Sequence, residues 1–516
     1  GFRTAPYFHN SIGILSEAAS ARLMSPTTVT ADQLARSSTR GMRSAMETTT
    51  NFPDPWPGGT WRPRNIVDME LVAARSVLSI AAKYREEYLQ DFFELGRKAT
   101  DEPIPAEAPI AYLVPAGQAR DEAVAKLITS LIDQGVEVYR LDSELHVTYG
   151  PQLLQRTNSA SERLGTYRTI IARTAAMQEV PSSSYIIFLA QPQRTNVLAL
   201  FEPQIYPNRL TAQGEAERPY DVAGWTLPLQ LGIDAPAVTA IRESASERKL
   251  TLVKDANEVR NDLALPLSKT GESPIKNPVG KTVRVGIYQG SIGNMDEGWT
   301  RYIFDTFNVP YTSARDADLR QEGLAAKYDV IILPSQRARD IIEGNPPTTI
   351  PAEYAGGITT KGASNLKDFV SAGGTLICFD ASCELAIKQF NLPLRNVLEN
   401  VRSSDFYCPG SIVSIDVDNT QPLGRGLSKA TNAYFIGSSA FEATDSSVKV
   451  TARYARDNLL KSGWLLGEDK LRNQIALAEV GVGKGRVVLF AFRPQHRGQT
   501  WATLPLIWNA ISTSVK

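Results

Sequence analysis

The feature that most constrains the fold is an alternation of short apolar runs and helical segments in residues 282–516. The runs VRVGIY, KYDVIILP and GTLICFD are typical of buried strands, and the segments between them, EGWTRYIFDTF and SNLKDFVSAG, are typical of helices. Strands that alternate with helices in this way are characteristic of parallel sheets. We therefore expect this region to form a doubly wound α/β domain.

Later segments of the same region predict additional strands. These are expected near SIVSIDV, VKVTARY, QIALAEV and GRVVLFAF, and the turn GVGKG suits a hairpin. The segment TLPLIWNAIS is expected to be a closing helix.

The middle of the chain predicts a second α/β region. A strand–helix–strand pattern is formed by the segments IAYLVPA, DEAVAKLITSLIDQG and VEVYRL, with Gly135 where a helix usually ends. A βαβ unit implies that its two strands are parallel. Polar, proline-containing segments at 101–108 and 255–281 are typical of linkers. With a length of 516 residues, we expect three domains, at 1–100, 107–255 and 282–516.

The N-terminal part predicts the end of a domain. The apolar run Ile12–Leu15 indicates a buried strand over about 11–17, and helical periodicity runs from Ile66 to about Lys98. Asn65 or Asp68 is expected at the start of this helix, which should pack across a sheet. Because the chain opens on Gly1 close to its first predicted strand, we expect it to begin inside a domain.

Composition excludes several classes of function. Lysine plus arginine and aspartate plus glutamate both number 55, so the balanced charge gives no global attraction to nucleic acid or anionic lipid. The basic residues are scattered, and no apolar run is long enough to span a bilayer. The three cysteines, Cys378, Cys383 and Cys408, form no disulfide framework.

Known catalytic motifs are missing from the sequence. His9, His146 and His496 lie far apart, and none belongs to an HxxE or HExxH motif, so the sequence shows no metal site. Neither GxSxG nor GxGxxG occurs. Ser382 or Cys383 lies where a nucleophile elbow would follow the strand GTLICF, but packing of a small residue at the corner is the favoured interpretation.

Two acidic segments are candidate sites. Glu17 follows an apolar run, and a partly buried carboxylate at a strand end would suit a general base. The alternatives are an ion pair with Arg22 or a cap for the next loop. Asp296–Trp299 follows the first strand of the C-terminal region, where doubly wound folds bind ligands. Favourable acidic residues at a helix N-terminus would explain that segment equally.

The segment GILSEAAS resembles the region of carboxypeptidase A-like zinc metallopeptidases that carries their catalytic glutamate. Several further phrases resemble bacterial multidomain members of that family: WPGGTWRPRNIVDMELVAARSVLSIAAKYREEYLQ, AYLVPAGQARDEAVAKLITSLIDQGVEVYRL, FLAQPQR, FEPQIYP and RPYDVAGWTLPLQLG. The class I glutamine-amidotransferase-like domain of those multidomain members is resembled by three segments of the C-terminal region: MDEGWTRYIFDTF, YDVIILP and FVSAGGTLICFD. The resemblance implies the end of a carboxypeptidase-like α/β domain, a middle α/β region and a flavodoxin-like C-terminal domain.

The same resemblance implies a zinc metallocarboxypeptidase that hydrolyses C-terminal peptide bonds. Glu17 would be the general base toward zinc-bound water, and Tyr7 would offer a phenol to the peptide substrate. The family's zinc ligands lie upstream of its glutamate, so zinc binding would require association with a peptidase segment that is missing from this sequence. The resemblance also implies a periplasmic or secreted protein.

Two other functions stay open at this point. One is a non-catalytic protein that binds peptide, glycan or a partner and lacks the metal site. The other is an amidotransferase-like enzyme acting through Cys383.

Overall fold

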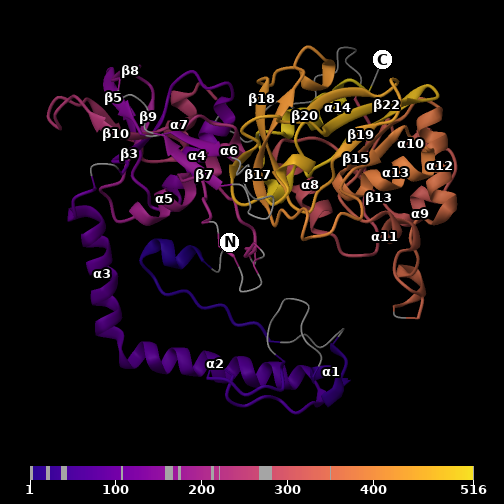
Figure 1. Ribbon diagram of the computed structural model, residues 1–516, viewed down its shortest axis with the longest axis horizontal. Coiled ribbons are helices and arrows are strands. Elements are labelled where there is room, and N and C mark those ends of the chain that lie inside the picture. The colour runs from indigo at the N-terminus through magenta and orange to yellow at the C-terminus, as the bar shows by residue number, and fades with distance from the viewer. Residues whose placement is uncertain are drawn as a thin grey trace. The chain divides into compact units, whose positions relative to one another are not determined.

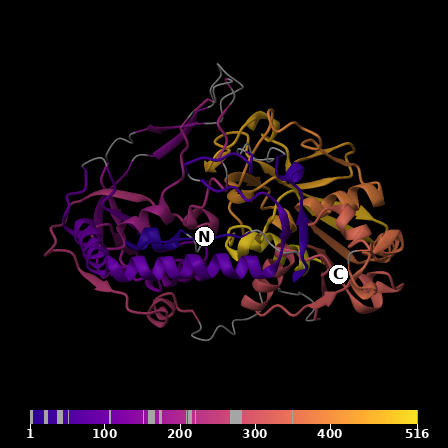
Figure 2. The ribbon, with the colours of Figure 1, turned by 90° about the horizontal axis from the view of Figure 1, so that it is seen from below.

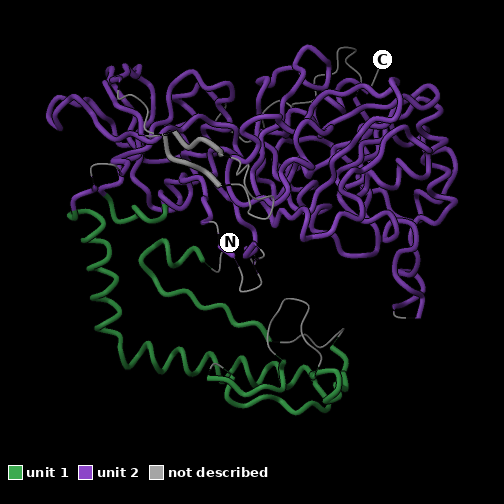
Figure 3. Tube along the Cα trace, in the orientation of Figure 1, with its two compact units in different colours: residues 1–102, 191–196 green, residues 103–190, 197–516 purple. Residues whose placement is uncertain are grey.

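A computed structural model shows a mixed α/β protein (Figure 1). It describes residues 4–18, 24–35, 44–50, 52–105, 108–150, 152–156, 167–171, 176–207, 209–210, 214, 216–219, 221–265, 282–348 and 350–514. The chain divides into two compact units (Figure 3), of which the first comprises residues 1–102 and 191–196 and the second the remainder. The predicted division into three domains stays a prediction.

The first unit contains a two-stranded antiparallel ribbon and three helices. These elements are β1 (Thr27–Val29), β2 (Gly59–Trp61), α1 (Ala31–Ala35), α2 (Pro63–Lys83) and α3 (Arg85–Asp101). Asn65 does serve the start of α2, since its Oδ1 accepts a hydrogen bond of 2.9 Å from the backbone N–H of Arg62. The single long helix that was predicted is wrong, because Tyr84 leaves helical geometry at φ −107° and ψ 22°.

The strand predicted over about 11–17 is also wrong. The backbone of residues 12–18 is irregular, and Ile12 and Ile14 are 66% and 68% exposed. An apolar run becomes a strand when a neighbouring strand pairs with it, and among the described residues none does so here. Neither α2 nor α3 contains a buried residue, so the expected packing of this helix across a sheet is absent from the described part of the unit. The described residues of this unit therefore do not confirm the expected end of a carboxypeptidase-like α/β domain.

The second unit begins with a seven-stranded sheet in the order β11-β4-β9-β3-β10-β5-β8. Its strands are β3 (Ala111–Val114), β4 (Tyr139–Leu141), β5 (Leu145–Tyr149), β8 (Gln178–Val180), β9 (Tyr185–Phe188), β10 (Ala237–Ile241) and β11 (Leu250–Leu252). A separate ribbon pairs β6 (Gln152–Arg156) with β7 (Tyr167–Ile171). The helices of this part are α4 (Asp121–Ile132), α6 (Leu227–Leu231) and α7 (Ala256–Asp262), together with most of α5 (Arg194–Phe201), whose first residues belong to the first unit.

The predicted βαβ unit exists in a split form. β3 and β4 run in the same direction, with α4 between them in the chain, but β9 lies between the two strands and is antiparallel to both. Every pairing in this sheet is therefore antiparallel. The local pattern of strand and helix cannot reveal a strand inserted from more than 40 residues later in the chain.

A twelve-stranded sheet forms the C-terminal part of the second unit. Its strands are β12 (Val285–Tyr288), β13 (Thr312–Ala314), β14 (Val330–Leu333), β15 (Thr375–Phe379), β16 (Leu394–Asn396), β17 (Ser411–Val417), β18 (Ala430–Phe435), β19 (Phe441–Ala443), β20 (Lys449–Tyr454), β21 (Leu460–Ser462), β22 (Ile475–Val482) and β23 (Gly485–Phe490). The helices are α8 (Met295–Thr306), α9 (Asp316–Leu319), α10 (Leu324–Lys327), α11 (Ala338–Glu343), α12 (Thr359–Ser371), α13 (Cys383–Phe390) and α14 (Leu504–Ser512).

Five neighbouring strands of this sheet are parallel, as the sequence predicts. The parallel strands follow the order β13-β12-β14-β15-β23, and β22 then joins β23 through the predicted GVGKG hairpin. Every residue of β12, β14 and β15 is buried, which explains their continuous apolar runs. Figure 2 shows this sheet and its helices from a second side, and α12 and α13 both pack against β15 and β23. Among the described helices, none is both long and apolar enough to cross a membrane.

Candidate functional site

The strand–helix corner after β15 is a packed structural feature. Ser382 is fully buried, and its hydroxyl donates to the carbonyl of Leu333 at 2.8 Å. Cys383 is also fully buried, and its thiol donates to the carbonyl of Phe490 at 3.2 Å. Burial raises the pKa of the Cys383 thiol well above its ordinary value. A thiol held in this way is a poor nucleophile, so the geometry gives no support to an amidotransferase acting through Cys383.

A charged cluster lies beside that corner. Asp380 directly follows β15, is 1% exposed and has the left-handed backbone angle φ 50°. Its carboxylate lies 2.7 Å from Nη1 of Arg493 and accepts hydrogen bonds from the backbone N–H of Ser439 at 3.1 Å and from the Ser438 hydroxyl at 3.3 Å. A buried carboxylate is thus held by one guanidinium and several dipoles.

Arg493 connects Asp380 to a second carboxylate. Its Nε lies 3.2 Å from Oδ1 of Asp296, and its Nη1 also donates to the carbonyl of Ile436 at 2.7 Å. Burial raises the pKa of Asp296 to about 6, against the opposing charge of Arg493. Burial likewise raises the pKa of Asp380 to about 6, again against Arg493 and with the Asp296 charge adding to the rise. The cluster therefore consists of two carboxyl groups with raised pKa values that share the Arg493 guanidinium.

The cluster forms because four neighbouring strands end at the same edge of the sheet. Asp296 follows β12, Gln336 follows β14, Asp380 follows β15 and Arg493 follows β23. Parallel strands present their carboxyl ends together, so four short segments far apart in sequence converge here. We call Asn294, Asp296, Gln336, Asp380, Arg493, Gln495 and His496 the carboxyl-edge site.

Several buried polar atoms of this site have no hydrogen-bond partner among the described residues. They are Oδ1 of Asp296, whose contact with Arg493 is an ion pair, Nε2 of Gln336, Oε1 of Gln495 and both ring nitrogens of His496. His496 stacks on Tyr434 with ring centroids 4.1 Å apart and meets the edge of Trp299 at 5.0 Å. Burial, with Arg497 and Arg493, lowers the pKa of His496 to about 3, so its ring is neutral and has one donor and one acceptor nitrogen.

The residues first predicted to be catalytic lie elsewhere. Tyr7 and Glu17 line a hollow of about 280 Å³ together with Thr4 and Leu15, in the first unit. The Tyr7 hydroxyl donates to the carbonyl of Gly13 at 2.6 Å. Glu17 is exposed, so the burial that favoured it as a general base is missing. Arg22, the alternative partner of Glu17, lies outside the described residues.

The histidines do not converge on a metal site. Nδ1 of His9 lies 2.8 Å from the carbonyl of Ala5, and Nδ1 of His146 lies 2.8 Å from Glu243. Within the described ranges, no group of three histidine, cysteine, aspartate or glutamate side chains could hold a metal ion. The zinc ligands were expected upstream of this sequence, so the zinc cofactor stays a prediction.

Comparison with known proteins identifies no family. No family model and no curated protein matches the chain. Among solved structures, a cytoplasmic protein from Salmonella typhimurium is 13% identical, with 45% of this chain and 98% of that chain covered and a TM-score of 0.31. PurLQS from Thermotoga maritima is 16% identical, with 46% and 100% covered and a TM-score of 0.30. A second cytoplasmic protein from Salmonella typhimurium is 12% identical, with 43% and 97% covered and a TM-score of 0.28.

The resemblance to carboxypeptidase A-like zinc metallopeptidases is therefore wrong. The solved structures that match are proteins of other kinds, and their likeness to this chain is itself too low to carry a functional argument.

Sequence reasoning located part of the carboxyl-edge site and missed the rest. Asp296 and Trp299 were singled out because they follow the first strand of the region. Asp380, Arg493 and His496 were not, although each follows a predicted strand as well. Applying the same strand-end rule to GTLICFD and GRVVLFAFRPQH would have found them.

Proposed function

We propose that the C-terminal region is a flavodoxin-like domain that binds a small, neutral, polyhydroxylated ligand, such as a sugar, without catalysis. Taken in chain order, its five parallel strands have the arrangement 2-1-3-4-5. Folds with this arrangement bind ligands outside the carboxyl ends of the strands, at the point between the first and third strands where the order reverses. Here that point lies between β12 and β14, where Asn294, Asp296 and Gln336 are found.

The observation that carries the proposal is the set of unpartnered buried polar atoms at this edge. Native proteins satisfy the great majority of buried polar atoms, and each exception calls for an ion, an ordered water or a ligand. Leaving one such atom unsatisfied costs about 1–3 kcal/mol, so a cluster of them indicates groups that are missing from the protein itself. The unpartnered atoms of Gln336 and Gln495 lie at the first turn of α8, next to the Asp296 carboxylate that pairs with Arg493.

The chemistry of these atoms favours hydroxyl groups. Asp296 Oδ1 and Gln495 Oε1 accept hydrogen bonds, Gln336 Nε2 donates them, and neutral His496 offers one of each. A hydroxyl both donates and accepts, so a polyol can satisfy both kinds of atom. Arg493, the cation of the carboxyl-edge site, is already matched by Asp296 and Asp380.

Catalysis is the weaker interpretation of the same site. Ser382 and Cys383 are buried and donate to carbonyls, and Asp380 is held by Arg493 and Ser438. A nucleophile must reach its substrate, and Ser382, Cys383 and Asp380 are each exposed by no more than 1%.

Isothermal titration calorimetry of the full chain with glucose, galactose, mannose and N-acetylglucosamine tests the proposal. At least one sugar should bind with a one-to-one stoichiometry. Replacing Asp296→Asn changes an acceptor that would contact the ligand, and it should weaken binding by about five- to tenfold. The matched control is Asp305→Asn near the other end of α8, where the carboxylate is exposed and binding should be unchanged.

A crystal structure of the protein soaked with sugar can show directly whether the binding proposal is wrong. If no sugar binds, and ordered waters alone occupy the unpartnered atoms of Asp296, Gln336 and Gln495, the binding proposal is wrong.

A further inference from the structure

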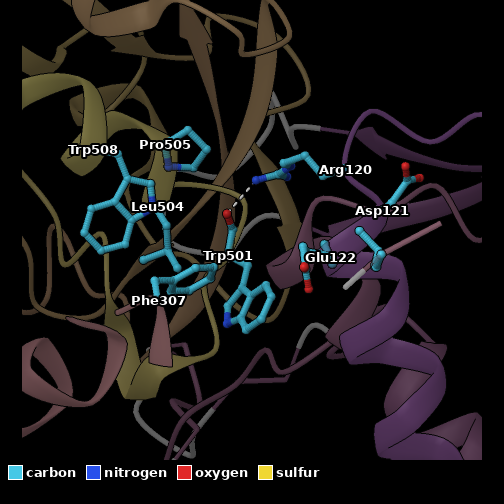
Figure 4. A pocket seen from close by; sticks show the side chains of 10 residues that line it. Arg120, Asp121, Glu122, Phe307, Trp501, Leu504, Pro505 and Trp508 are labelled. Atoms are coloured by element: carbon cyan, nitrogen blue, oxygen red, sulfur yellow. Dashed lines mark hydrogen bonds between the residues drawn. The ribbon is translucent and has the colours of Figure 1, made fainter. Parts of the chain in front are cut away.

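A second site lies away from the carboxyl edge, in a pocket of about 320 Å³ between the start of α4 and the start of α14 (Figure 4). Pockets of this size are at the lower end of those that hold small molecules. The residues that line it are Arg120, Asp121, Glu122, Ala123, Leu265, Phe307, Trp501, Leu504, Pro505 and Trp508. All of them belong to the second unit.

One wall of the pocket is aromatic and held in place. The rings of Phe307 and Trp501 are 4.9 Å apart, and those of Phe307 and Trp508 are 5.7 Å apart. The indole N–H of Trp501 donates to the carbonyl of Gly498 at 3.0 Å, which fixes the orientation of that ring. Figure 4 shows the Trp501 indole directed into the space between Phe307 and Glu122. The wall is therefore formed before any ligand arrives.

The opposite side of the pocket carries Arg120, whose two terminal nitrogens donate to backbone carbonyls. Its guanidinium donates to the carbonyl of Trp501 at 2.5 Å, to that of Leu231 at 3.0 Å and to that of Gly232 at 3.5 Å. Burial also lowers the pKa of Arg120. This arginine thus connects α4 to the loop before α14 through hydrogen bonds to neutral carbonyls.

The polar groups left at the mouth are carboxylates. Glu122 is held by Arg260 through two hydrogen bonds of 2.9 and 3.1 Å, and its free lone pairs still accept. Asp121 is exposed and forms no ion pair with another described residue. A ligand that fills the pocket will therefore meet an apolar, aromatic wall at one end and hydrogen-bond acceptors at the other.

We infer that this pocket binds a small organic amine with an aromatic or apolar body. The body packs against Trp501 and Phe307, and the ammonium group lies at the mouth beside Asp121 and Glu122. Aromatic faces attract cations as well as apolar groups, so the wall tolerates an ammonium that approaches it. A carboxylate at the same position would meet the negative charge of Asp121, for which the described residues provide no ion pair, whereas the charge of Glu122 is matched by Arg260. This inference does not depend on sugar binding at the carboxyl edge.

The probes are 2-phenylethylamine, its neutral analogue 2-phenylethanol and the acid 3-phenylpropionate, titrated into the full chain at pH 7. Tryptophan fluorescence and calorimetry measure binding. The amine should bind one-to-one, about five- to tenfold more tightly than the alcohol, because an ion pair at a partly exposed position contributes about 1 kcal/mol. The acid should bind most weakly of the three.

Two variants test the two ends of the pocket. Asp121→Asn should bring amine and alcohol to within about twofold of each other while leaving the alcohol's affinity unchanged. Its matched control is Asp133→Asn at the other end of the same helix, which should preserve the preference for the amine. Trp501→Ala should abolish binding of both ligands, whereas Trp225→Ala, at a tryptophan that is 39% exposed and outside the pocket, should not.

The inference fails on any of three results. One is the absence of saturable amine binding. Another is equal affinity for the amine and the acid. The third is amine binding that survives Trp501→Ala. If Trp501→Ala does not fold, Trp501→Phe replaces it, because this variant keeps a ring in the wall of the pocket. In that case the test rests on Asp121→Asn, and amine binding that is unchanged in this variant overturns the inference. Sugar binding measured in the same variants shows whether the carboxyl-edge site is affected.

Discussion

Replacing Arg493 with methionine should destabilise the protein by an amount that grows with pH. Arg493 is the cation that lies between Asp380, 1% exposed, and Asp296, 9% exposed. Methionine keeps much of the side-chain volume but removes the charge. Breaking a buried ion pair from one side costs about 3–5 kcal/mol when the remaining charge stays ionised.

The pH dependence follows from the two carboxyl groups. Burial raises both pKa values to about 6 from an ordinary 3.8, despite Arg493. The folded state then binds more protons than the unfolded state between about pH 4 and pH 6, so stability decreases as pH rises through that window, by roughly 3 kcal/mol for each carboxyl. Without Arg493 the pKa values of Asp296 and Asp380 in the folded protein rise further. The decrease in stability therefore extends to higher pH.

Urea unfolding followed by circular dichroism at pH 5 and pH 8 measures this effect. The destabilisation of Arg493→Met should be about 1 kcal/mol at pH 5, where the carboxyls are protonated, and about 3–5 kcal/mol at pH 8. Arg337→Met is the matched control, since that arginine is 81% exposed and pairs with Asp340 at the surface. It should change stability by less than about 1 kcal/mol at either pH.

A second substitution separates charge from packing. Adding Asp380→Asn to Arg493→Met removes one uncompensated buried charge and should recover most of the loss at pH 8. Equal destabilisation at the two pH values, or no recovery in the double variant, would show that Arg493 acts through packing alone and would refute the electrostatic reasoning.

Three further predictions follow from single positions. Gly232→Ala should lower stability by about 1–3 kcal/mol in urea unfolding, because its φ is 70° and a Cβ would collide with the Arg120 guanidinium. Cys383 should resist iodoacetamide in the native protein and react once it is unfolded, as mass spectrometry would show, because its thiol is fully buried; native labelling would contradict that burial. Gly483→Val should weaken the β22–β23 hairpin by more than about 1 kcal/mol, since φ is 60° and a side chain would meet the Ser371 backbone at 2.7 Å; an unchanged midpoint would argue against that strain.

Local pattern was sufficient wherever a segment is buried on both faces. The apolar runs of β12, β14 and β15, the GVGKG hairpin and the closing helix α14 were all predicted, because each pattern matches the environment that the segment meets. Pattern failed at Ile12–Leu15, where an equally apolar run lies exposed without a strand partner. An apolar run is stabilised by burial, but whether it is buried depends on a neighbouring element that packs against it.

The sequence by itself determined the α/β class and the parallel part of the C-terminal sheet, and it singled out the segment at Asp296 as a candidate. Tertiary structure alone decided the insertion of β9 between β3 and β4, and it alone brought Arg493 between Asp296 and Asp380. Those three residues are separated by more than 80 positions, and each looks ordinary in its own segment. They meet because parallel strands end at one edge of a sheet, and strand order is a property of long-range packing that local sequence does not record.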